Sequence, residues 1–495
     1  MRFGSLARMP TLRSLAILAL SSISLLALLV TSRRISSWSA FDEPYYPRGD
    51  LHRTHHAPQG TIDNATDGRH ARRGRDPMCA GFPDTSSILV VLKTGASESF
   101  ARVPTQLMTV LKCHDDFLIF SDMDQDIAGY RVHDSLDTVR PEIKVGNADF
   151  DLYRRQQTCL VDQESCNKLG NPSSEGWNLD KYKNIHAADK AFAMRPGYDW
   201  YLFIDADTYV LWPNLVAWLS KLKPTVKHYL GSVTLINDFA FGHGGSGYIL
   251  SNPAMKEFVG SHPGIGNVWD GRAVSECCGD YVFALALNDT TSLRVKQVWP
   301  TINGEKPATL PFGPSHWCHP IVTMHHLNSE EISSFWSFER QLYHAQDGNA
   351  KHQPLLIRDI YDRYVAPRIV EKLEDWDNLS NDRIYLDTSE GRNWEKWMLN
   401  RMQKPEKYNE FEKKAHMSFE DCGAACKSLG KTECFQYKYT DGQCLMASSI
   451  RLGKPVKKES DEKRRLMSGW AVEKIDDWIK KQGSCSKVHW PEAKS

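Results

Sequence analysis

The sequence has no excess of either charge. Its 495 residues include 61 Lys and Arg and 61 Asp and Glu, so the formal net charge is zero. Proteins that bind nucleic acid neutralise its phosphates with a surplus of Lys and Arg, and this chain offers none. We therefore expect no nucleic-acid partner.

A Walker phosphate-binding loop is also missing. The glycine-rich run between Phe239 and Ser251 has four glycines in six positions but no Gly-Lys-Ser or Gly-Lys-Thr. Glycines let the backbone approach a ligand closely, although a tight turn before a strand or helix gives the same pattern.

Cysteine, in contrast, is plentiful. Twelve cysteines, several of them late in the chain, indicate an oxidising compartment. The adjacent Cys277 and Cys278 do not easily reach the geometry of a disulfide, so we expect each to find another partner, such as Cys318. Three sequons support the same compartment as glycosylation acceptors: Asn64, Asn288 and Asn378.

Near the N-terminus, Ser14–Ser32 carries only apolar or small hydroxylated side chains. As a helix this run would span about 28 Å, close to the thickness of a bilayer's hydrocarbon core. A cleaved signal peptide is the competing interpretation, but the run is long for one and two arginines follow at once. We predict a cytosolic tail (1–13), a single-pass type II anchor (14–32) and a flexible stem (33–84), with the folded part in the lumen of the Golgi or ER–Golgi system.

The folded part is predicted to begin with a β-α-β unit. Ser87–Leu92 is a short apolar run suited to a parallel strand that is buried on both faces. A helical pattern with Val103 and Leu107 on one face follows, and Phe117–Phe120 is typical of the next strand. This spacing predicts a parallel sheet and an α/β domain over residues 85–345.

The stretch Asp199–Val210 is the centre of the predicted domain. An apolar and aromatic run, typical of a buried strand, ends in Asp205 and Asp207 with Ala206 between them. Alternating side chains would put both carboxylates on one side of the strand end, where open α/β sheets bind ligands. Two such charges call for a cation or a ligand, and a solvated loop is the alternative.

Two further features have ordinary explanations when taken alone. Asp280 lies at the start of an apolar helix, where an aspartate commonly serves as a cap. His325 and His326 end a strand-like run, and such a pair is usually a surface or core feature. Both features indicate a functional site only when they are considered together with the other motifs.

Seven short motifs follow one another between about Ser87 and about Arg340. They are Val91–Thr94 with Arg102, Ile119–Asp122, Trp177–Lys183, Trp200–Val210, His243–Ser251, Gly279–Asp280 and Val322–Leu327. Each is weak alone. In this order they resemble glycosyltransferase family 31, the Fringe-like and core-1 β1,3-galactosyltransferase-like enzymes, and fungal members most closely.

The resemblance implies a GT-A fold, a nucleotide-sugar donor, a divalent cation (usually manganese) and inversion at the anomeric carbon. Asp207 would bind the metal directly, Asp205 would contact the ribose or a metal-bound water, and His325 would complete the metal site. Asp280 falls on the family's catalytic carboxylate. Around the nucleotide and the donor sugar the resemblance places Thr94, Arg102, Asp122, Lys183, Gly244 and Gly245.

The residue types themselves, considered without the resemblance, allow the same metal-assisted transfer chemistry. A hard cation held by carboxylates stabilises a diphosphate leaving group, and one imidazole beside them suits Mn²⁺ better than Ca²⁺. Inversion needs one carboxylate that takes the proton from the acceptor hydroxyl. The chain departs from the family where paired acids are common, so the base rests on Asp280 alone, with Glu276 as a stand-in. Asp205-Ala206-Asp207 likewise replaces the fuller acidic run of Fringe proteins, which leaves room for another donor.

A second resemblance covers residues 411–490. A helical segment with cysteines four apart, followed by strand-like segments with two more, resembles a PAN/Apple domain. A helical pair with this spacing points both thiols to one side. Our hypothesis is a Cys422–Cys444 and a Cys426–Cys434 disulfide, although four cysteines allow other pairings and a zinc site is the rival. Such domains bind protein or carbohydrate or are only structural, and residues 346–410 are expected to be a connector.

Together these patterns predict a Mn²⁺-dependent inverting glycosyltransferase. It would move a hexose, galactose above all, from a UDP-sugar to a hydroxyl of a glycan or glycoprotein, in a β1,3 linkage. The alternative from another class is a catalytically silent, membrane-tethered protein that binds carbohydrate or protein through its C-terminal module. Intact Asp207, Asp280 and His325 favour the enzyme.

Overall fold

The structure is a computed structural model, and it describes residues 76–492 except 115 and 346–352. The predicted tail, anchor and most of the stem, with the sequon at Asn64, lie outside this range. Within the described part of the chain, no helix has both the length and the apolar character needed to cross a bilayer.

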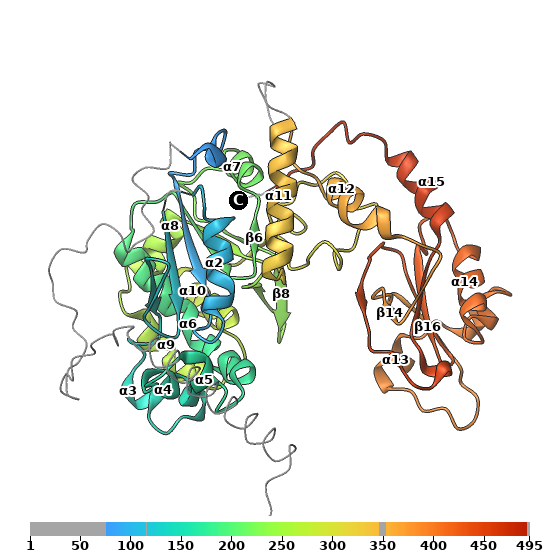
Figure 1. Ribbon diagram of the computed structural model, residues 1–495, viewed down its shortest axis with the longest axis horizontal. Coiled ribbons are helices and arrows are strands. Elements are labelled where there is room, and N and C mark those ends of the chain that lie inside the picture. Colours follow the sequence, from blue (N-terminus) through green and yellow to red (C-terminus); the bar gives the residue numbers. More distant parts are fainter. Residues whose placement is uncertain (1–75, 115, 346–352, 493–495) are drawn as a thin grey trace, which may run out of the picture. The chain divides into compact units, whose positions relative to one another are not determined.

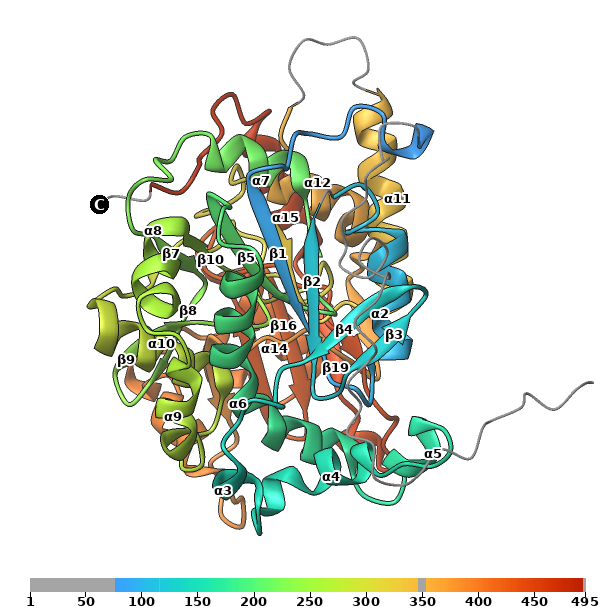
Figure 2. The same ribbon diagram turned by 90° about the vertical axis from the view of Figure 1, so that its left-hand side faces the viewer.

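The protein is built on an eight-stranded mixed sheet with the strand order β11-β7-β10-β5-β1-β2-β4-β3 (Figures 1 and 2). Its centre is parallel, with β1 (Ile88–Lys93) between β2 (Phe117–Ser121) and β5 (Trp200–Asp205). The outer strands are β3 (Gln125–Ile127), β4 (Tyr130–Asp134), β7 (Tyr229–Gly231), β10 (Tyr248–Ser251) and β11 (Lys296–Gln297). The α/β class and the first β-α-β unit, which contains α2 (Ser99–Met108), are confirmed.

Alternating side chains along β1 explain why the sheet is covered on both faces. Ile88, Val90 and Leu92 belong to one buried cluster, and Leu89 and Val91 belong to another. The first cluster is covered by α2, α7 (Trp212–Leu219) and α11 (Ser329–Ala345), and the second by α6 (Pro172–Met194) and α10 (Gly279–Thr291). An apolar strand with a helical layer on each side is what the continuous run Ser87–Leu92 predicts.

Shorter elements complete this part of the protein. β6 (Tyr209–Val210) follows β5 and pairs with β12 (Thr323–Met324), while β8 (Val233–Ile236) and β9 (Phe239–Gly242) form a hairpin before β10. The strand expected at Val322–Leu327 is limited to two residues because the chain turns at His326, whose φ is 63°. The remaining short helices are α3 (Pro141–Lys144), α4 (Asp151–Gln157), α5 (Gln163–Asn167), α8 (Asn252–Met255), α9 (Ile265–Ala273) and α12 (Ile357–Ile360).

A second, five-stranded sheet forms the C-terminal part. Its order is β13 (Lys372–Glu374), β19 (Met467–Trp470), β16 (Gln436–Thr440), β17 (Gln443–Ala447) and β15 (Arg383–Leu386). Helix α14 (Phe419–Ser428) is joined to it by the Cys422–Cys444 and Cys426–Cys434 disulfides, the pairing that we hypothesised. The expected boundary at residue 411 falls inside this sheet, since β13 and β15 come from the expected connector. Both strands are too short to show a period in the sequence.

The two sheets share one hydrophobic core. Phe435 of the C-terminal part and Trp478 on α15 (Val472–Gln482) belong to the same buried cluster as Trp317. The Trp317 and Trp478 rings lie 4.9 Å apart, and a disulfide joins Cys318 to Cys485 beside them. The C-terminal sheet is therefore attached through buried contacts as well as through the backbone.

The expectation for the adjacent cysteines is wrong. Cys277 and Cys278 bond to each other, so neither is available for Cys318. Their Cα atoms are 3.8 Å apart, closer than in most disulfides. Neighbouring side chains can nevertheless close a small ring that includes the peptide bond between them, which the general distance rule does not consider.

The expectation for the sequon at Asn378 is also wrong. Its side chain is fully buried, and its amide donates hydrogen bonds to the carbonyls of Tyr437 and Gly469. A glycan attached there would have no room in the folded protein. Asn288, half-buried on α10, stays a predicted acceptor.

A buried carboxyl group behind β6 gives a test of this packing. Glu339 on α11 accepts a hydrogen bond from the Tyr209 hydroxyl, and burial raises the pKa of Glu339 from 4.5 to about 7. Between these two pH values the unfolded chain ionises this group while the folded protein does not, so the free energy of unfolding falls as pH rises. Above about pH 7 we expect Glu339→Gln to be more stable than wild type by up to about 3 kcal/mol, and near pH 4.5 to be equal to it.

Urea unfolding of both proteins at the two pH values measures this difference. Glu330→Gln is the control, because Glu330 is exposed on the same helix and should change stability little at either pH. An equal effect of Glu339→Gln at both pH values would show that Glu339 is already ionised in the folded protein at neutral pH.

Candidate functional site

A cleft of about 500 Å³ opens at the carboxyl ends of β1 and β5. Helices α2, α6 and α10 and the loops after β5, β9 and β12 also contribute to its walls. The polar residues that line it include Lys93, Thr94, Glu98, Arg102, Asp180, Lys183, Asp205, Asp207, His243, Asp280, His325 and His326. Every residue predicted for the site lines this one cleft, with the exceptions of Asp122 and of the stand-in base Glu276, which pairs with Arg272.

Asp207, His325 and His326 form a cluster that can hold a metal ion, with one ligand atom from each within 4.8 Å of the others. Asp207 Oδ1 and His325 Nε2 are 3.1 Å apart. The β6–β12 ribbon brings them together, because Met324 pairs with Tyr209 and the two ligands extend from these strands. Nδ1 of His325, the ring nitrogen that does not contact Asp207, is buried without a hydrogen-bond partner among the described residues.

The sequence predicted two members of this cluster and missed His326. Neighbouring side chains on a strand point to opposite faces, so one of two adjacent histidines would be expected to point away. The left-handed backbone at His326 removes that alternation and keeps its ring within 3.8 Å of the His325 ring, measured between centroids. A histidine pair at a strand end is thus the only sequence signal for it.

The protonation states of the cluster suit metal binding. Burial alone would raise the pKa of Asp207, but the hydrogen bond and charge of His325 and the Arg102 guanidinium hold it below its ordinary value. Arg102 Nη1 lies 3.4 Å from Asp207 Oδ2. Burial and the neighbouring His325 lower the pKa of His326, which favours the neutral imidazole. An anionic carboxylate and a neutral imidazole are the forms that bind metals.

Asp205 has a different role from Asp207. The register of β1 and β5 places Lys93 opposite Asp205, and Lys93 Nζ lies 3.4 Å from its carboxylate and 2.7 Å from Asp180. Asp205 is not part of the three-residue cluster, although the sequence grouped it with the metal ligands. The expected alternation ends with β5 at Asp205, so it does not fix where Asp207 points. Lys93 and Asp180 lie within two of the seven motifs, although the resemblance implies no role for either.

The loop after β9 joins the metal cluster to Asp280. The Gly244 N–H donates a hydrogen bond to Asp280 Oδ2 at 2.7 Å. A Cβ atom on Gly245 would lie 2.1 Å from His325 Cε1, so only glycine leaves room for that ring. On the other side, the Thr208 hydroxyl donates to the Gly245 carbonyl at 2.7 Å.

Asp280 is the second residue of α10. Its Oδ1 accepts a hydrogen bond from the Tyr281 N–H at 2.8 Å, but the N-cap residue of α10 is Cys278, so Asp280 is not the helix cap. Burial raises the pKa of Asp280. A raised pKa makes a carboxylate a better proton acceptor, and this one faces the cleft.

The expectation for Asp122 needs correction. Its side chain is fully buried and absent from the cleft wall. Oδ1 accepts a hydrogen bond from the Ala96 N–H at 2.8 Å and lies 3.0 Å from Lys183 Nζ, which also donates to the Thr94 carbonyl. Asp122 therefore fixes the loop after β1 and the lysine behind it, whereas Thr94 and Lys183 do line the cleft.

The charges in the cleft do not cancel. Three side chains are fixed cations and five are carboxylates, so the difference is two negative charges before any histidine is protonated. The cations are Lys93, Arg102 and Lys183, and the carboxylates are Glu98, Asp180, Asp205, Asp207 and Asp280. A divalent cation would balance this excess.

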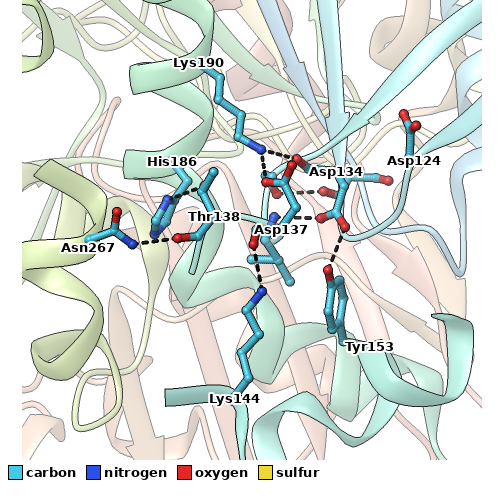
Figure 3. A network of polar contacts seen from close by, with 12 residues as sticks. Asp124, Asp134, Asp137, Thr138, Lys144, Tyr153, His186, Lys190 and Asn267 are labelled. Carbon is cyan, nitrogen blue, oxygen red and sulfur yellow. Dashed lines mark hydrogen bonds and ion pairs between the residues drawn. The ribbon is translucent and has the colours of Figure 1, made fainter. Parts of the chain in front are cut away.

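A second polar network lies outside this cleft (Figure 3). Thr138 Oγ1 is 3.0 Å from His186 Nδ1, and His186 Nε2 is 2.8 Å from Asp270, an order found in nucleophile relays. His186 and Asp270 are buried, however, and the imidazole fills the space that a Cβ on Gly266 would need. The network connects α6 to α9, and we assign it to structure.

No model of a known protein family matches the chain. Function is therefore inferred from the geometry and chemistry of the cleft. Its residues offer three functions together: a ligand set for a divalent cation, basic side chains for an anionic group, and a carboxylate that can accept a proton.

The contact between Gly245 and His325 gives a direct test of the metal cluster. In Gly245→Ala the new methyl group must displace the His325 ring. We expect the affinity for Mn²⁺, measured by calorimetry, to fall about 10- to 100-fold, as happens when the support of a ligand is lost.

Gly197→Ala is the matched control. Gly197 lies in the turn before β5, and a Cβ there would meet no atom within 4 Å. This variant should bind Mn²⁺ as wild type does. Unchanged affinity in Gly245→Ala would show that His325 is not a ligand.

Proposed function

We propose that this protein is a metal-dependent inverting glycosyltransferase with a GT-A fold, related to family 31. It would transfer a hexose, in the first place galactose, from a UDP-sugar to a hydroxyl of a glycan or glycoprotein, with a β1,3 linkage. The observation that carries the proposal is the meeting of Asp207 and His325, 3.1 Å apart, in the same cleft as Asp280. The proposed setting is the lumen of the Golgi or ER–Golgi system, with a type II anchor at residues 14–32 and a PAN/Apple-like module at the C-terminus.

Asp207, His325 and His326 would hold the cation, which we propose to be Mn²⁺. The donor set fits this ion, since carboxylate with imidazole suits Mn²⁺ better than Ca²⁺. When bound, the cation would offset the charge that develops on the diphosphate as it leaves. Arg102 and Lys183 line the same cleft and are the side chains suited to the phosphate oxygens.

Asp280 would act as the general base. Its carboxylate takes the proton of the acceptor hydroxyl as that oxygen attacks the anomeric carbon, and the bond from this carbon to the UDP oxygen breaks. The hydrogen bond from Gly244 orients one carboxylate oxygen. Attack from the face opposite the leaving group inverts the configuration, through a transition state that resembles an oxocarbenium ion.

The alternative, a silent binding protein, requires none of these arrangements. It explains neither the ligand cluster nor the proton acceptor in the same cleft. The two functions differ in what Mn²⁺ does: it is required for turnover in the enzyme and is irrelevant to a binding module.

Removal of Asp207 tests the enzyme directly. We expect purified full-length protein to hydrolyse or transfer from a UDP-sugar only with Mn²⁺, and Asp207→Ala to lower turnover at least about 100-fold because a metal ligand is lost. A panel of UDP-sugars, with release of UDP as the readout, also identifies the donor. Asp199→Ala is the control, because Asp199 is exposed at the other end of the same strand. Turnover that is absent or independent of metal would favour the binding protein.

Asp280→Asn separates chemistry from binding. We expect UDP–Mn²⁺ affinity within about twofold of wild type and transfer reduced about 10²- to 10⁴-fold, the range for loss of a general base. In wild type, transfer should decline as pH falls and Asp280 becomes protonated. Because burial raises its pKa, this decline should begin at a higher pH than for an exposed aspartate. Loss of nucleotide binding in Asp280→Asn would mean that Asp280 is structural.

A further inference from the structure

One of the six disulfides differs from the others in what it can stabilise. All twelve cysteines are paired, and five bonds join residues that are 7 to 167 positions apart. Cys277–Cys278 joins neighbours. A disulfide stabilises a fold largely by closing a loop in the unfolded chain, and the effect grows with loop length. This bond closes no such loop, so its effect must be local.

Its position is next to the proposed base. Cys278 precedes the first residue of α10, lines the cleft, and is followed two residues later by Asp280. The intervening Gly279 has no free space, since a Cβ there would lie 2.5 Å from the Asp180 carbonyl oxygen on α6. The start of α10 is therefore held between α6 on one side and the loop of Gly244 on the other.

We propose that the Cys277–Cys278 disulfide is a positioning element for Asp280 and that glycosyl transfer depends on its oxidised state. This inference rests on the proposed function, in which Asp280 accepts the proton of the acceptor. The bond restricts the backbone torsions of the dipeptide that leads into α10 and so fixes where the carboxylate points. The acceptor hydroxyl must lie against Asp280, so Cys278 borders the acceptor side of the cleft.

The bond is open to exchange with a small dithiol. Cys277 is exposed, whereas the four cysteines that join α14 to the C-terminal sheet are fully buried. A thiolate of the dithiol attacks the Cys277 sulfur, breaks the S–S bond and forms a mixed disulfide. The second thiolate of the same molecule then releases Cys277, and both protein thiolates take protons from water. The dithiol leaves as its own cyclic disulfide, having given two electrons to the protein.

The test compares two double variants of the full-length protein. Cys277→Ser/Cys278→Ser should lower kcat for transfer about 10- to 100-fold, as expected for a base displaced by roughly 1 Å, while UDP–Mn²⁺ affinity stays within about twofold of wild type. Cys159→Ser/Cys166→Ser is the matched control: it removes another short-range disulfide, from a segment that does not line the cleft, and should leave kcat unchanged. In wild type, loss of transfer during titration with a dithiol should follow alkylation of Cys277 and Cys278, read by mass spectrometry, and reoxidation should restore it.

Each result decides the question. A kcat equal to wild type in Cys277→Ser/Cys278→Ser overturns the positioning role and leaves the proposed enzyme intact. Equal losses of kcat, UDP–Mn²⁺ affinity and thermal stability also overturn it, because the bond would then serve only the fold. Wild-type protein that neither binds UDP–Mn²⁺ nor transfers sugar removes both proposals.

Discussion

Two consecutive glycines, Gly244 and Gly245, position two of the side chains that line the cleft. The N–H of Gly244 binds Asp280, and the ring of His325 occupies the space that a side chain on Gly245 would need. Asp280 and His325 come from different elements, α10 and the end of β12, and each contacts one of these two glycines. The main chain of these two glycines therefore sets the distance between Asp280, the proposed base, and His325, a proposed metal ligand, and main chain varies less than the rotamers of side chains.

The carboxylates at the ends of the central strands have different partners. Lys93, fixed opposite Asp205 by strand register, satisfies Asp205 and Asp180. Burial raises the pKa of Asp205 to about 6, and the Lys93 charge opposes this rise, so Asp205 is ionised beside Lys93 at neutral pH. Asp207 lies two residues beyond the end of β5 and pairs with His325 instead. The carboxylate left for a cation is thus Asp207, and the register of two parallel strands decides this.

The sequence predicted what depends on local pattern. The apolar runs identified β1, β2 and β5, and the order of motifs placed Asp207, Asp280 and His325 in one cleft. The predictions that failed depend on contacts between residues that are distant in the sequence, and no local pattern shows such contacts. The burial of Asp122 depends on Lys183, which is far away in sequence, and that of Asn378 on strands that form only when the second sheet closes. Strand alternation, a sound rule inside β5, gave no guidance once the strand had ended.

The C-terminal sheet supports the same site. Trp317 and Cys318, which bind it through the Trp478 ring and the Cys485 disulfide, lie shortly before β12, the strand that leads into His325. Between them the Asn214 amide on α7 donates to the Ile321 carbonyl and fixes the approach to β12. Without the C-terminal part Trp317 would lose its cover and Cys318 its partner, close to the metal cluster. The C-terminal sheet therefore supports β12, the strand that leads into the proposed metal ligand His325.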